Sequence, residues 1–425
     1  MLHPKTNSKL FLSLLFILSS LKIYAQDGTN SPYSRLGLGD LVAPAYAHQA
    51  GMANIGVSYT RPNFINNTNP ALLARTDFTI FEGGAMMGFK VLENNSNVSQ
   101  QDFGGNLNYL SLAFPIRKKW TMNIGLMPYT SVRYRDQFNQ NVVNSNFTAF
   151  YDFQGTGGLT QLHWSNGVEL FKNFFLGFKL GYIFGATTKQ ASATLNSGVE
   201  SSRTVLVQRY RYNDLTFEAG LAYTFKLNDK YSLNTGLVYG INRDINATRF
   251  EALERRLLNN DLAILADTLV NNAKGTVTLP EKYSFGISIH NEYKWLVGLD
   301  ISMQNWSNFR DFGRNDSLRN ALSVGLGFEI TPNIYAIDKK DFFKRATYRV
   351  GFNYIQNPVK FAGVNLDEFA VTAGVSLAFN RNIAMFNIAV RAGTRGALSL
   401  IRENYIRLNL GITINDKWFV KRKID

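Results

Sequence analysis

Strict alternation of apolar and polar residues, repeated over segments of roughly ten residues, constrains the fold of this chain more than any other feature. In the segment YIRLNLGITI, every second residue from Ile406 to Ile414 is apolar, and the residues between them are polar, aromatic or small. Successive side chains of a β-strand point to opposite faces, so such a segment is predicted to be a strand with one apolar face. The same pattern recurs in FFLGFKLGYIF at 174–184, YSFGISIH at 283–290 and WLVGLDIS at 295–302.

The polar faces of these segments carry mainly small residues with isolated charges such as Lys179, Asp300 and Arg407. A soluble β-sandwich would present Lys, Glu and Thr to water on that face. Small residues with single charges are typical of a crowded interior, and a bilayer admits strands only when a closed barrel pairs every backbone group. No run of eighteen apolar residues follows residue 25, so no membrane-spanning helix is expected after it. The sequence therefore predicts an all-β, antiparallel transmembrane β-barrel.

Short links and long polar stretches alternate between the predicted strands. Outer-membrane barrels have short periplasmic turns and long external loops, so we expect fourteen strands, with the C-terminus in the periplasm. The short links are RKKW at 117–120, FKNF at 171–174, KLNDKY at 226–231, NEYKW at 291–295 and FNRN at 379–382. The outward strands are expected at 77–90, 119–134, 174–188, 231–245, 294–305, 345–355 and 383–393, and the returning strands at 105–115, 158–170, 214–227, 282–291, 319–330, 366–379 and 403–414.

The N-terminus has the pattern of a secretory signal peptide. Lys5 and Lys9 supply positive charge, Phe11–Leu21 is largely apolar, and Ala25 offers a small residue before a cleavage point at Gln26. We therefore expect an exported protein of the Gram-negative outer membrane. The chain contains no Cys, so its stability must come from packing and strand closure. The expected divisions are a signal peptide at 1–25, an N-terminal region at 26–76, a barrel at 77–415 and a basic periplasmic tail at 416–425.

The region 26–76 does not alternate and is rich in Gly, Ala and Asn. A short helix is predicted after Asn69, because Asn is a favourable N-cap and Pro70 suits the first helical position. Near the start of this region, SPYSRLGLGDL has glycines before an acidic residue, as a phosphate-binding loop does. It lacks the preceding strand and the third glycine of such a loop. Gly37 and Gly39 are instead expected to let the chain bend in a narrow space, so that replacing both would harm assembly or gating without affecting nucleotide binding.

Two of the long polar stretches stand out. The stretch at 189–213 carries Arg203, Arg209 and Arg211, and the stretch at 246–281 contains RFEALERRLLNNDLAILADTL. The leucines of the second stretch recur at helical spacing, which predicts a surface helix. That helix either offers an apolar patch to a ligand or partner, or packs down on neighbouring loops. The candidate surface consists of Leu253, Leu257, Leu258, Leu262 and Leu265. A long basic link at 331–346 is a second candidate contact for a partner or for lipid headgroups.

No enzyme signature is present. The four His residues show no metal-ligand spacing, no GxSxG elbow occurs, and a chain without Cys has no thiol nucleophile. The net charge is +14, but the basic residues are scattered singly or in short groups rather than in one patch. We therefore expect no catalytic residues, no metal, no cofactor and no nucleic-acid partner.

Two segments in the N-terminal region resemble a known family. AGMANIGVSY at 50–59 and NTNPALLAR at 67–75, placed before a fourteen-stranded barrel, look like the FadL/TodX-like outer-membrane transport proteins. The triplet Asn69-Pro70-Ala71 matches the hatch motif of that family. SPYSRLGLGDL and the C-terminal NDKWFVKRKID resemble its members from the Bacteroidota.

The resemblance implies a barrel plugged by an N-terminal hatch that passively takes up small hydrophobic molecules of the fatty-acid or aromatic type. In that family the ligand lands on a groove of the third and fourth external loops and leaves through a lateral gap at a kink in the third strand. Pro128 lies in the predicted third strand, where it removes a ladder donor. Asn69, Pro70, Ala71, Gly37, Gly39 and Pro128 are thus the candidate hatch or gating residues.

Relatives of this type also serve as non-transporting accessory barrels in type IX secretion or outer-membrane protein assembly. A transporter is expected to have an apolar pocket between hatch and wall. An accessory subunit is expected to have a filled lumen and an apolar or basic docking surface. The stretch at 189–213 is rich in Ser and Arg, which departs from a hydrophobic capture groove.

Overall fold

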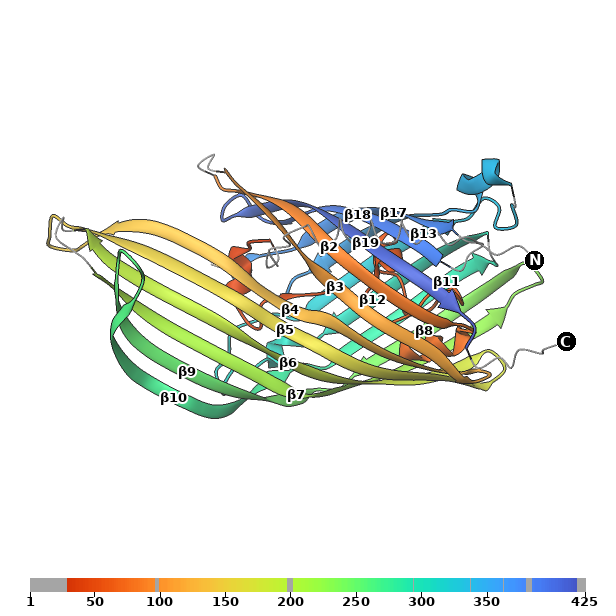
Figure 1. Cartoon of the computed structure of the whole chain (residues 1–425), viewed down its shortest axis with the longest axis horizontal. Coiled ribbons are helices and arrows are strands. Elements are labelled where there is room, and N and C mark those ends of the chain that lie inside the picture. Colours follow the sequence, from red (N-terminus) through yellow and green to blue (C-terminus); the bar gives the residue numbers. More distant parts are fainter. Residues whose placement is uncertain are drawn as a thin grey trace, which may run out of the picture.

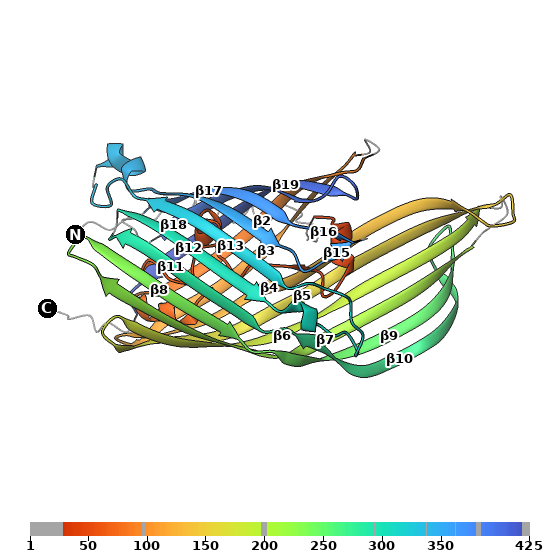
Figure 2. The same cartoon turned by 180° about the vertical axis from the view of Figure 1, so that it is seen from behind.

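The computed structural model describes residues 29–95, 99–196, 202–292, 294–336, 338–361, 363–379 and 384–418. Fourteen antiparallel strands close into a transmembrane β-barrel, as predicted from the alternation (Figures 1 and 2). The barrel closes where the last strand pairs along its length with the first. In order around the ring, the strands are β2 (Thr79–Glu93), β3 (Ser99–Arg117), β4 (Trp120–Asn141), β5 (Thr148–Phe171), β6 (Phe174–Asn196), β7 (Ser202–Lys226), β8 (Tyr231–Gly240), β11 (Lys282–Asn291), β12 (Trp295–Gln304), β13 (Ala321–Ile330), β14 (Thr347–Gln356), β17 (Glu368–Phe379), β18 (Ala384–Gly396) and β19 (Arg402–Asp416).

The two faces of each strand differ as the sequence pattern requires. In β19, Tyr405 and Thr413 are buried inside the barrel, whereas Ile406, Ile412 and Ile414 are exposed on the outside. Lys179, whose charge interrupts an apolar segment of the sequence, is likewise buried inside. The apolar outer faces suit the hydrocarbon of a membrane. Among the residues that the structure describes, no helix is long and apolar enough to cross a membrane.

The strands are very unequal in length. β4 to β7 have 22 to 25 residues, whereas β8 and β11 to β14 have 10 each. The long strands project beyond the rest of the barrel as a curved wall, at the left of Figure 1. The end of the barrel that carries this wall is called the long-strand end below, and the opposite end the short-turn end. The expectation that 189–213 forms an external loop is wrong for its described residues, because β6 and β7 continue through them.

The helix expected within 246–281 is also wrong. Beyond Gly240 the chain bends and continues as β9 (Arg243–Leu257), which pairs with the upper half of β7 and then with β10 (Ala263–Leu279). The backbone groups of the upper half of β7 need partners, and β9 provides them in a continuous ladder. Leu253 and Leu257 are four residues apart, a spacing that puts two side chains on one face of a helix and also on one face of a strand.

β3 and β4 separate toward the long-strand end. They pair only between Leu110–Arg117 and Trp120–Leu126. Above this point β3 pairs with β2 alone, whereas β4 continues to pair with β5. The short strand β1 (Asp40–Leu41) of the N-terminal region lies against β4 opposite Ser131 and Thr130. This separation is called the seam below.

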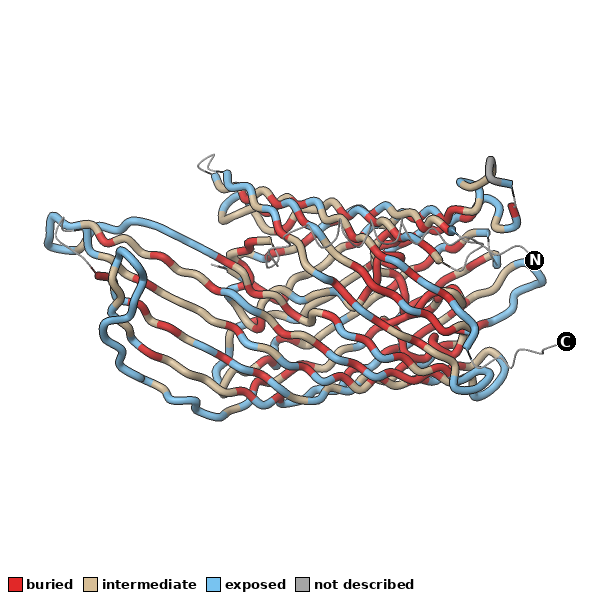
Figure 3. The backbone as a smooth tube through the Cα atoms, viewed as in Figure 1, coloured by how far each residue is buried: buried red, intermediate tan, exposed pale blue. Residues whose placement is uncertain are grey.

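The hatch, here residues 29–76, lies inside the barrel. It contains the 3-10 helix η1 (Pro32–Arg35), β1, the single-turn helix α2 (Ala47–Ala50) and the 3-10 helix η2 (Pro70–Arg75). Buried residues are most concentrated where the hatch meets the wall, as Figure 3 shows. The helix predicted after Asn69 is confirmed as η2, with Asn69 as its N-cap. The expected signal peptide at 1–25 and most of the tail at 416–425 lie outside the described residues.

Candidate functional site: the hatch and the barrel wall

The expected hatch motif holds η2 against the wall of β5, β6 and β7. The side-chain oxygen of Asn69 accepts a hydrogen bond from the backbone N–H of Ala71 at 3.0 Å. Its amide nitrogen donates to the carbonyl of Val57 at 2.7 Å and to that of Leu221 at 3.0 Å. Asn69 therefore links the helix, another hatch segment and strand β7 at once. The bonds to Ala71 and Val57 are buried and the bond to Leu221 is partly buried, so these hydrogen bonds replace ones that water would otherwise supply.

The hatch backbone approaches the wall where the wall carries glycine. A methyl group added to Gly167 of β5 would lie 2.5 Å from the carbonyl oxygen of Pro70. One added to Gly351 of β14 would lie 2.7 Å from the nitrogen of Ala53, and one added to Gly374 of β17 would lie 2.8 Å from the Cα of Gly51. No water layer fits between surfaces this close. Further wall glycines in contact with the hatch are Gly177, Gly220, Gly236, Gly286, Gly298, Gly325 and Gly327.

A buried cluster of charges fastens the hatch to the far wall. Arg61 of the hatch donates to Glu329 of β13 at 2.5 Å, and Arg349 of β14 donates to the same carboxylate at 2.6 Å. The side chains of Glu329 and Arg349 are only 5% and 2% exposed. Arg61 also donates to the hydroxyl of Thr331 at 2.9 Å. Because one carboxylate balances two guanidinium groups, the cluster depends on all three charged residues together.

A second cluster fastens the start of the hatch. Arg395 of β18 contacts Asp40 of the hatch at 2.9 Å and Glu403 of β19 at 2.7 Å, and Lys90 of β2 contacts Glu403 at 3.1 Å. The hydroxyl of Ser31 donates to Glu403 at 2.7 Å. Burial alone would raise the pKa of Asp40, but the charge and hydrogen bonds of Arg395 outweigh it and lower the pKa below its ordinary value. The carboxylate therefore stays ionised and bound.

Single charged wall residues bond the hatch backbone directly. Asp300 accepts hydrogen bonds from the N–H groups of Gly56 and Val57 at 2.7 and 2.9 Å. Lys179 donates to the carbonyl of Asn67 at 2.8 Å and pairs with Glu218 at 3.0 Å. The alternation correctly predicted that Lys179 and Asp300 face inward. Their hatch partners carried no signal in the sequence, because they are backbone groups more than a hundred residues away.

A buried apolar layer lies inside the barrel, where the start of the hatch meets the long strands. It joins hatch side chains to strand side chains and to the segment that follows β12, which begins with the 3-10 helix η3 (Trp306–Asn308). Every member is between 0% and 7% exposed. The members are Tyr33, Leu38, Leu159, Ile183, Tyr210, Tyr212, Ile245, Ala247, Val277, Leu279, Trp306, Phe309, Leu318, Val359 and Leu366.

The two glycines near the start of the hatch both have backbone angles that favour glycine. The φ angles are +57° at Gly37 and +97° at Gly39. A methyl group on Gly39 would lie 2.6 Å from the carbonyl oxygen of Ser131 in β4. Pro128 lies nearby in β4, where the register with β5 shifts between Pro128 and Thr130. The structure thus brings Gly39 and Pro128 to the seam, while the Asn69-Pro70-Ala71 triplet lies against β5, β6 and β7.

The candidate leucine surface is far from the hatch. Leu253 and Leu257 lie on β9, Leu258 and Leu262 in the turn that follows, and Leu265 on β10, all in the projecting wall (Figure 2). Within the described part of the chain, no group of His, Asp or Glu side chains is placed to hold a metal ion.

Solved structures of several transport proteins have the same fold. The Ralstonia pickettii toluene transporter TbuX matches with a TM-score of 0.56 and 13% identity, covering 87% of this chain and 98% of its own. A Pseudomonas aeruginosa FadL homologue matches with a TM-score of 0.58 and 15% identity, over 89% of this chain and 99% of its own. The Pseudomonas putida toluene transporter TodX matches with a TM-score of 0.56 and 15% identity, over 90% and 100%. Identities this low show a shared fold alone.

A family model described as BamG matches residues 8–425. No curated protein matches the sequence. Since the family model spans almost the entire sequence, the chain, with its FadL/TodX-type barrel, belongs to the BamG family.

Proposed function

We propose that this protein is a sealed accessory barrel, a structural subunit of an outer-membrane protein assembly or type IX secretion complex. The observation that carries the proposal is the filled interior. A pocket for a small ligand occupies roughly 300 to 1,000 Å³ and leaves its lining side chains accessible. The apolar layer above the hatch consists of fifteen buried side chains, and six further, partly buried hydrophobic residues pack against it. The hatch below it touches the wall backbone and is fastened by buried ion pairs.

The hairpin of β9 and β10 supplies a surface for a protein partner. Its turn and its second strand expose apolar side chains, with Leu262 59% and Leu265 67% exposed. β10 pairs with β9 on one side, and only its last residues contact another segment, where Phe312 donates to the carbonyl of Thr276. Elsewhere along β10, the described residues supply no strand on its second side. An unpaired edge of this kind binds an extended segment of another chain by adding a strand.

The short-turn end offers a second surface. The link between β13 and β14 contains the 3-10 helix η4 (Lys339–Lys344) and exposes Tyr335 and Phe343. It stands away from the barrel in Figure 1. In an outer-membrane barrel with short periplasmic turns, this link would face the periplasm. The family name BamG also supports protein partners.

Native purification in mild detergent followed by mass spectrometry tests the proposal. We expect stoichiometric partner proteins with the wild type, and their loss from a variant carrying Leu262→Asp and Leu265→Asp. Val143→Asp is a matched control, because Val143 is 83% exposed in the turn between β4 and β5 and belongs to neither strand of the hairpin. A lone barrel that carries only co-purified lipid would contradict the proposal.

Passive uptake of a small hydrophobic molecule is the second candidate function, and the seam is the feature that favours it. At the seam, β3 and β4 no longer pair with each other, which would allow a lateral exit into the membrane. Gly39 and Pro128 lie beside the seam. The solved structures of the same fold include toluene transporters. Purified protein in liposomes should then accelerate uptake of toluene or a long-chain fatty acid. No acceleration over empty liposomes is the outcome expected of a sealed barrel.

A further inference from the structure

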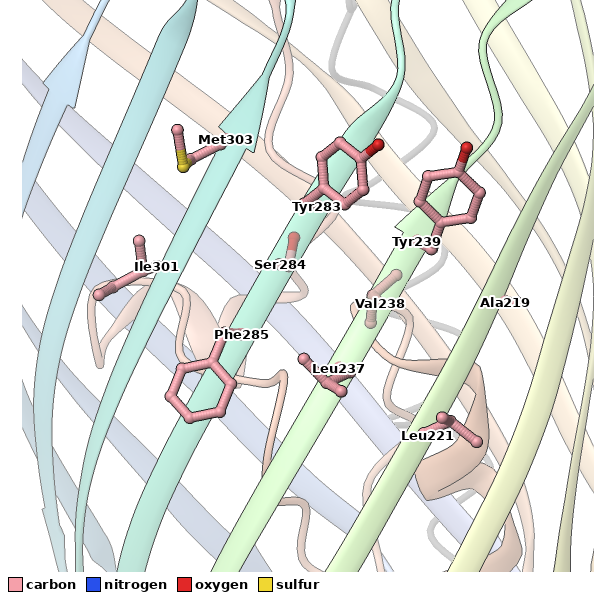
Figure 4. Close-up of a pocket in the computed structure, with 10 residues that line it drawn as sticks. All are labelled: Ala219, Leu221, Leu237, Val238, Tyr239, Tyr283, Ser284, Phe285, Ile301 and Met303. Atoms are coloured by element: carbon pink, nitrogen blue, oxygen red, sulfur yellow. The ribbon is translucent and has the colours of Figure 1, made fainter.

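A shallow apolar groove crosses the outer, membrane-facing wall below the bend that leads into β9 and β10. It has a volume of about 380 Å³ and is formed by strands β7, β8, β11 and β12. Ala219 leaves space on β7, and Leu237, Phe285 and Met303 stand around it (Figure 4). The rings of Tyr239 and Tyr283 lie 5.1 Å apart, and their hydroxyls mark one end of the groove in Figure 4.

Above the groove, the outer face of β7 changes from apolar to basic. Phe217 and Leu215 are exposed apolar residues, and the next charged residues along this face are Arg211 and Arg209. The ladder places Arg211 opposite Thr248 of β9, and Thr248 opposite Lys274 of β10.

The three basic side chains of this cluster are exposed and close enough to act together. Adjacent strands lie roughly 4.8 Å apart, so the Cα atoms of Arg211 and Lys274 are about 10 Å apart, and both side chains can reach one group between them. Arg209 stacks over the ring of Phe250 at 5.7 Å. Among the described residues, no acidic side chain forms an ion pair with Arg209, Arg211 or Lys274.

We propose that the groove and this basic cluster bind one phosphorylated lipid, with an acyl chain in the groove and the phosphate at Arg209, Arg211 and Lys274. Ala219 and Arg211 are eight residues apart on β7, or roughly 26 Å along the strand. With barrel strands tilted by roughly 40°, the rise along the membrane normal is about 20 Å. One leaflet with its headgroups is about as thick, since a whole bilayer measures roughly 40–45 Å.

The chemistry favours a membrane lipid over a free anion or a protein. The basic cluster continues directly into the apolar band that faces hydrocarbon, so an occupant must be apolar on one side and anionic on the other. With the short turns in the periplasm, the site faces the outer leaflet. Unpaired Arg and Lys at a membrane boundary attract lipid phosphates, and their long side chains can extend toward the headgroups. Thr248 adds a hydroxyl between the two basic strands.

Binding of a fluorescent bisphosphorylated glycolipid of the lipid A type to the full chain in nanodiscs of phosphatidylethanolamine tests the proposal. We expect the triple variant Arg209→Gln, Arg211→Gln, Lys274→Gln to bind about 100-fold more weakly, since each basic residue at an anionic surface contributes about fivefold. The matched control is Lys172→Gln, Lys226→Gln, Lys230→Gln, which removes three exposed charges from the short turns. Ala219→Phe, which fills the groove, should weaken binding, whereas Ala373→Phe on the outer face of β17 should not.

Several outcomes would overturn the proposal. They are unchanged affinity of the triple variant, equal loss in the control variant, and displacement of the glycolipid by millimolar inorganic phosphate. Heat-modifiable gel migration verifies that each variant is folded. If the triple variant does not fold, Arg211→Gln alone should lower the affinity about fivefold. Lys274 lies on β10, but the lipid site uses the outer face of the wall, whereas the proposed partner surface uses the exposed leucines Leu262 and Leu265 and the free edge of β10. The variants Leu262→Asp and Leu265→Asp leave all three basic residues in place, so failure of the lipid proposal and failure of the proposed function are distinguishable.

Discussion

Glu329 is the single residue on which the fastening of the hatch to the far wall depends most. Its carboxylate is the shared partner of Arg61 and Arg349 in the interior of the barrel. The sequence predicted that polar residues of this strand face the lumen, because alternation determines the face. It could not identify the partner Arg61, which lies 268 residues earlier in a region without alternation.

Replacing Glu329 with Gln should destabilise the folded barrel by about 3–5 kcal/mol, because two buried arginines lose their counter-charge. Glu93→Gln is the matched control: Glu93 pairs with Arg402, but both side chains are more than 30% exposed, so its loss should cost about 1 kcal/mol or less. Urea unfolding of both variants in detergent measures the difference. Equal midpoints would mean that the cluster does not hold the hatch.

Gly39→Ala should destabilise the hatch through two effects. A left-handed backbone costs a non-glycine residue about 1–2 kcal/mol, and the added methyl group would collide with the carbonyl oxygen of Ser131. Gly313→Ala separates the two effects, since Gly313 has a φ of +76° and open space around it. We expect a lower temperature of gel-mobility transition for Gly39→Ala than for Gly313→Ala. Identical shifts would show that the hatch is not packed against β4 at this point.

The β9–β10 hairpin is the element that the sequence predicted incorrectly. The spacing of its leucines fits a helix, and the segment becomes a strand only because a neighbouring strand is available to pair with it. That partner is the upper half of β7, a segment expected to be loop because it is polar and rich in Arg. The fourteen barrel strands were predicted correctly because each must bury one face in the interior and present the other to lipid. The upper half of β7 also buries one face, with Tyr210 and Tyr212, but its outer face carries Arg209 and Arg211 instead of apolar residues. Its sequence therefore lacks the apolar face that marks a lipid-facing strand.

Pairs of introduced cysteines distinguish the strand from the helix. Because the chain has no native Cys, no other disulfide can form within it. Leu206→Cys with Leu253→Cys should form a disulfide, because these residues are directly opposite each other on β7 and β9. Leu253→Cys with Leu257→Cys should not, because four residues of strand span roughly 13 Å. Gel mobility with and without reductant reports both results. A disulfide in the second pair and none in the first would contradict the strand and support a helix in this segment.

At the scale of the whole molecule, the hatch and barrel form one packed body. Its interior contains ion pairs, backbone hydrogen bonds and apolar contacts that cross from the hatch to many of the surrounding strands. This arrangement was predictable only in outline. The resemblance of 50–59 and 67–75 to a hatch indicated a plug, whereas the tightness of the seal depends on wall glycines whose neighbours the sequence does not identify.

A disulfide that locks the hatch to the wall tests which function this seal permits. Leu41→Cys with Thr130→Cys joins β1 to β4 at the seam. If the barrel is a sealed accessory subunit, the oxidised variant should retain its partner proteins and support normal levels of outer-membrane proteins in cells. The wall disulfide between positions 206 and 253 is the matched control. Loss of partners only in the oxidised seam variant would show that the hatch must move.

Because the strand lengths are unequal, the two sides of the barrel differ in height. A uniform cylinder looks the same to neighbours approaching from any direction in the membrane plane. Here one sector, formed by β4 to β7 with β9 and β10, projects far beyond the rest of the barrel, whereas the strands of the sector from β11 to β14 are short (Figure 2). A neighbouring protein with a large domain at the long-strand end fits beside the short strands, whereas the projecting strands exclude that domain on the other side. Any assembly that contains this chain must therefore fix its rotation about the membrane normal as well as its position.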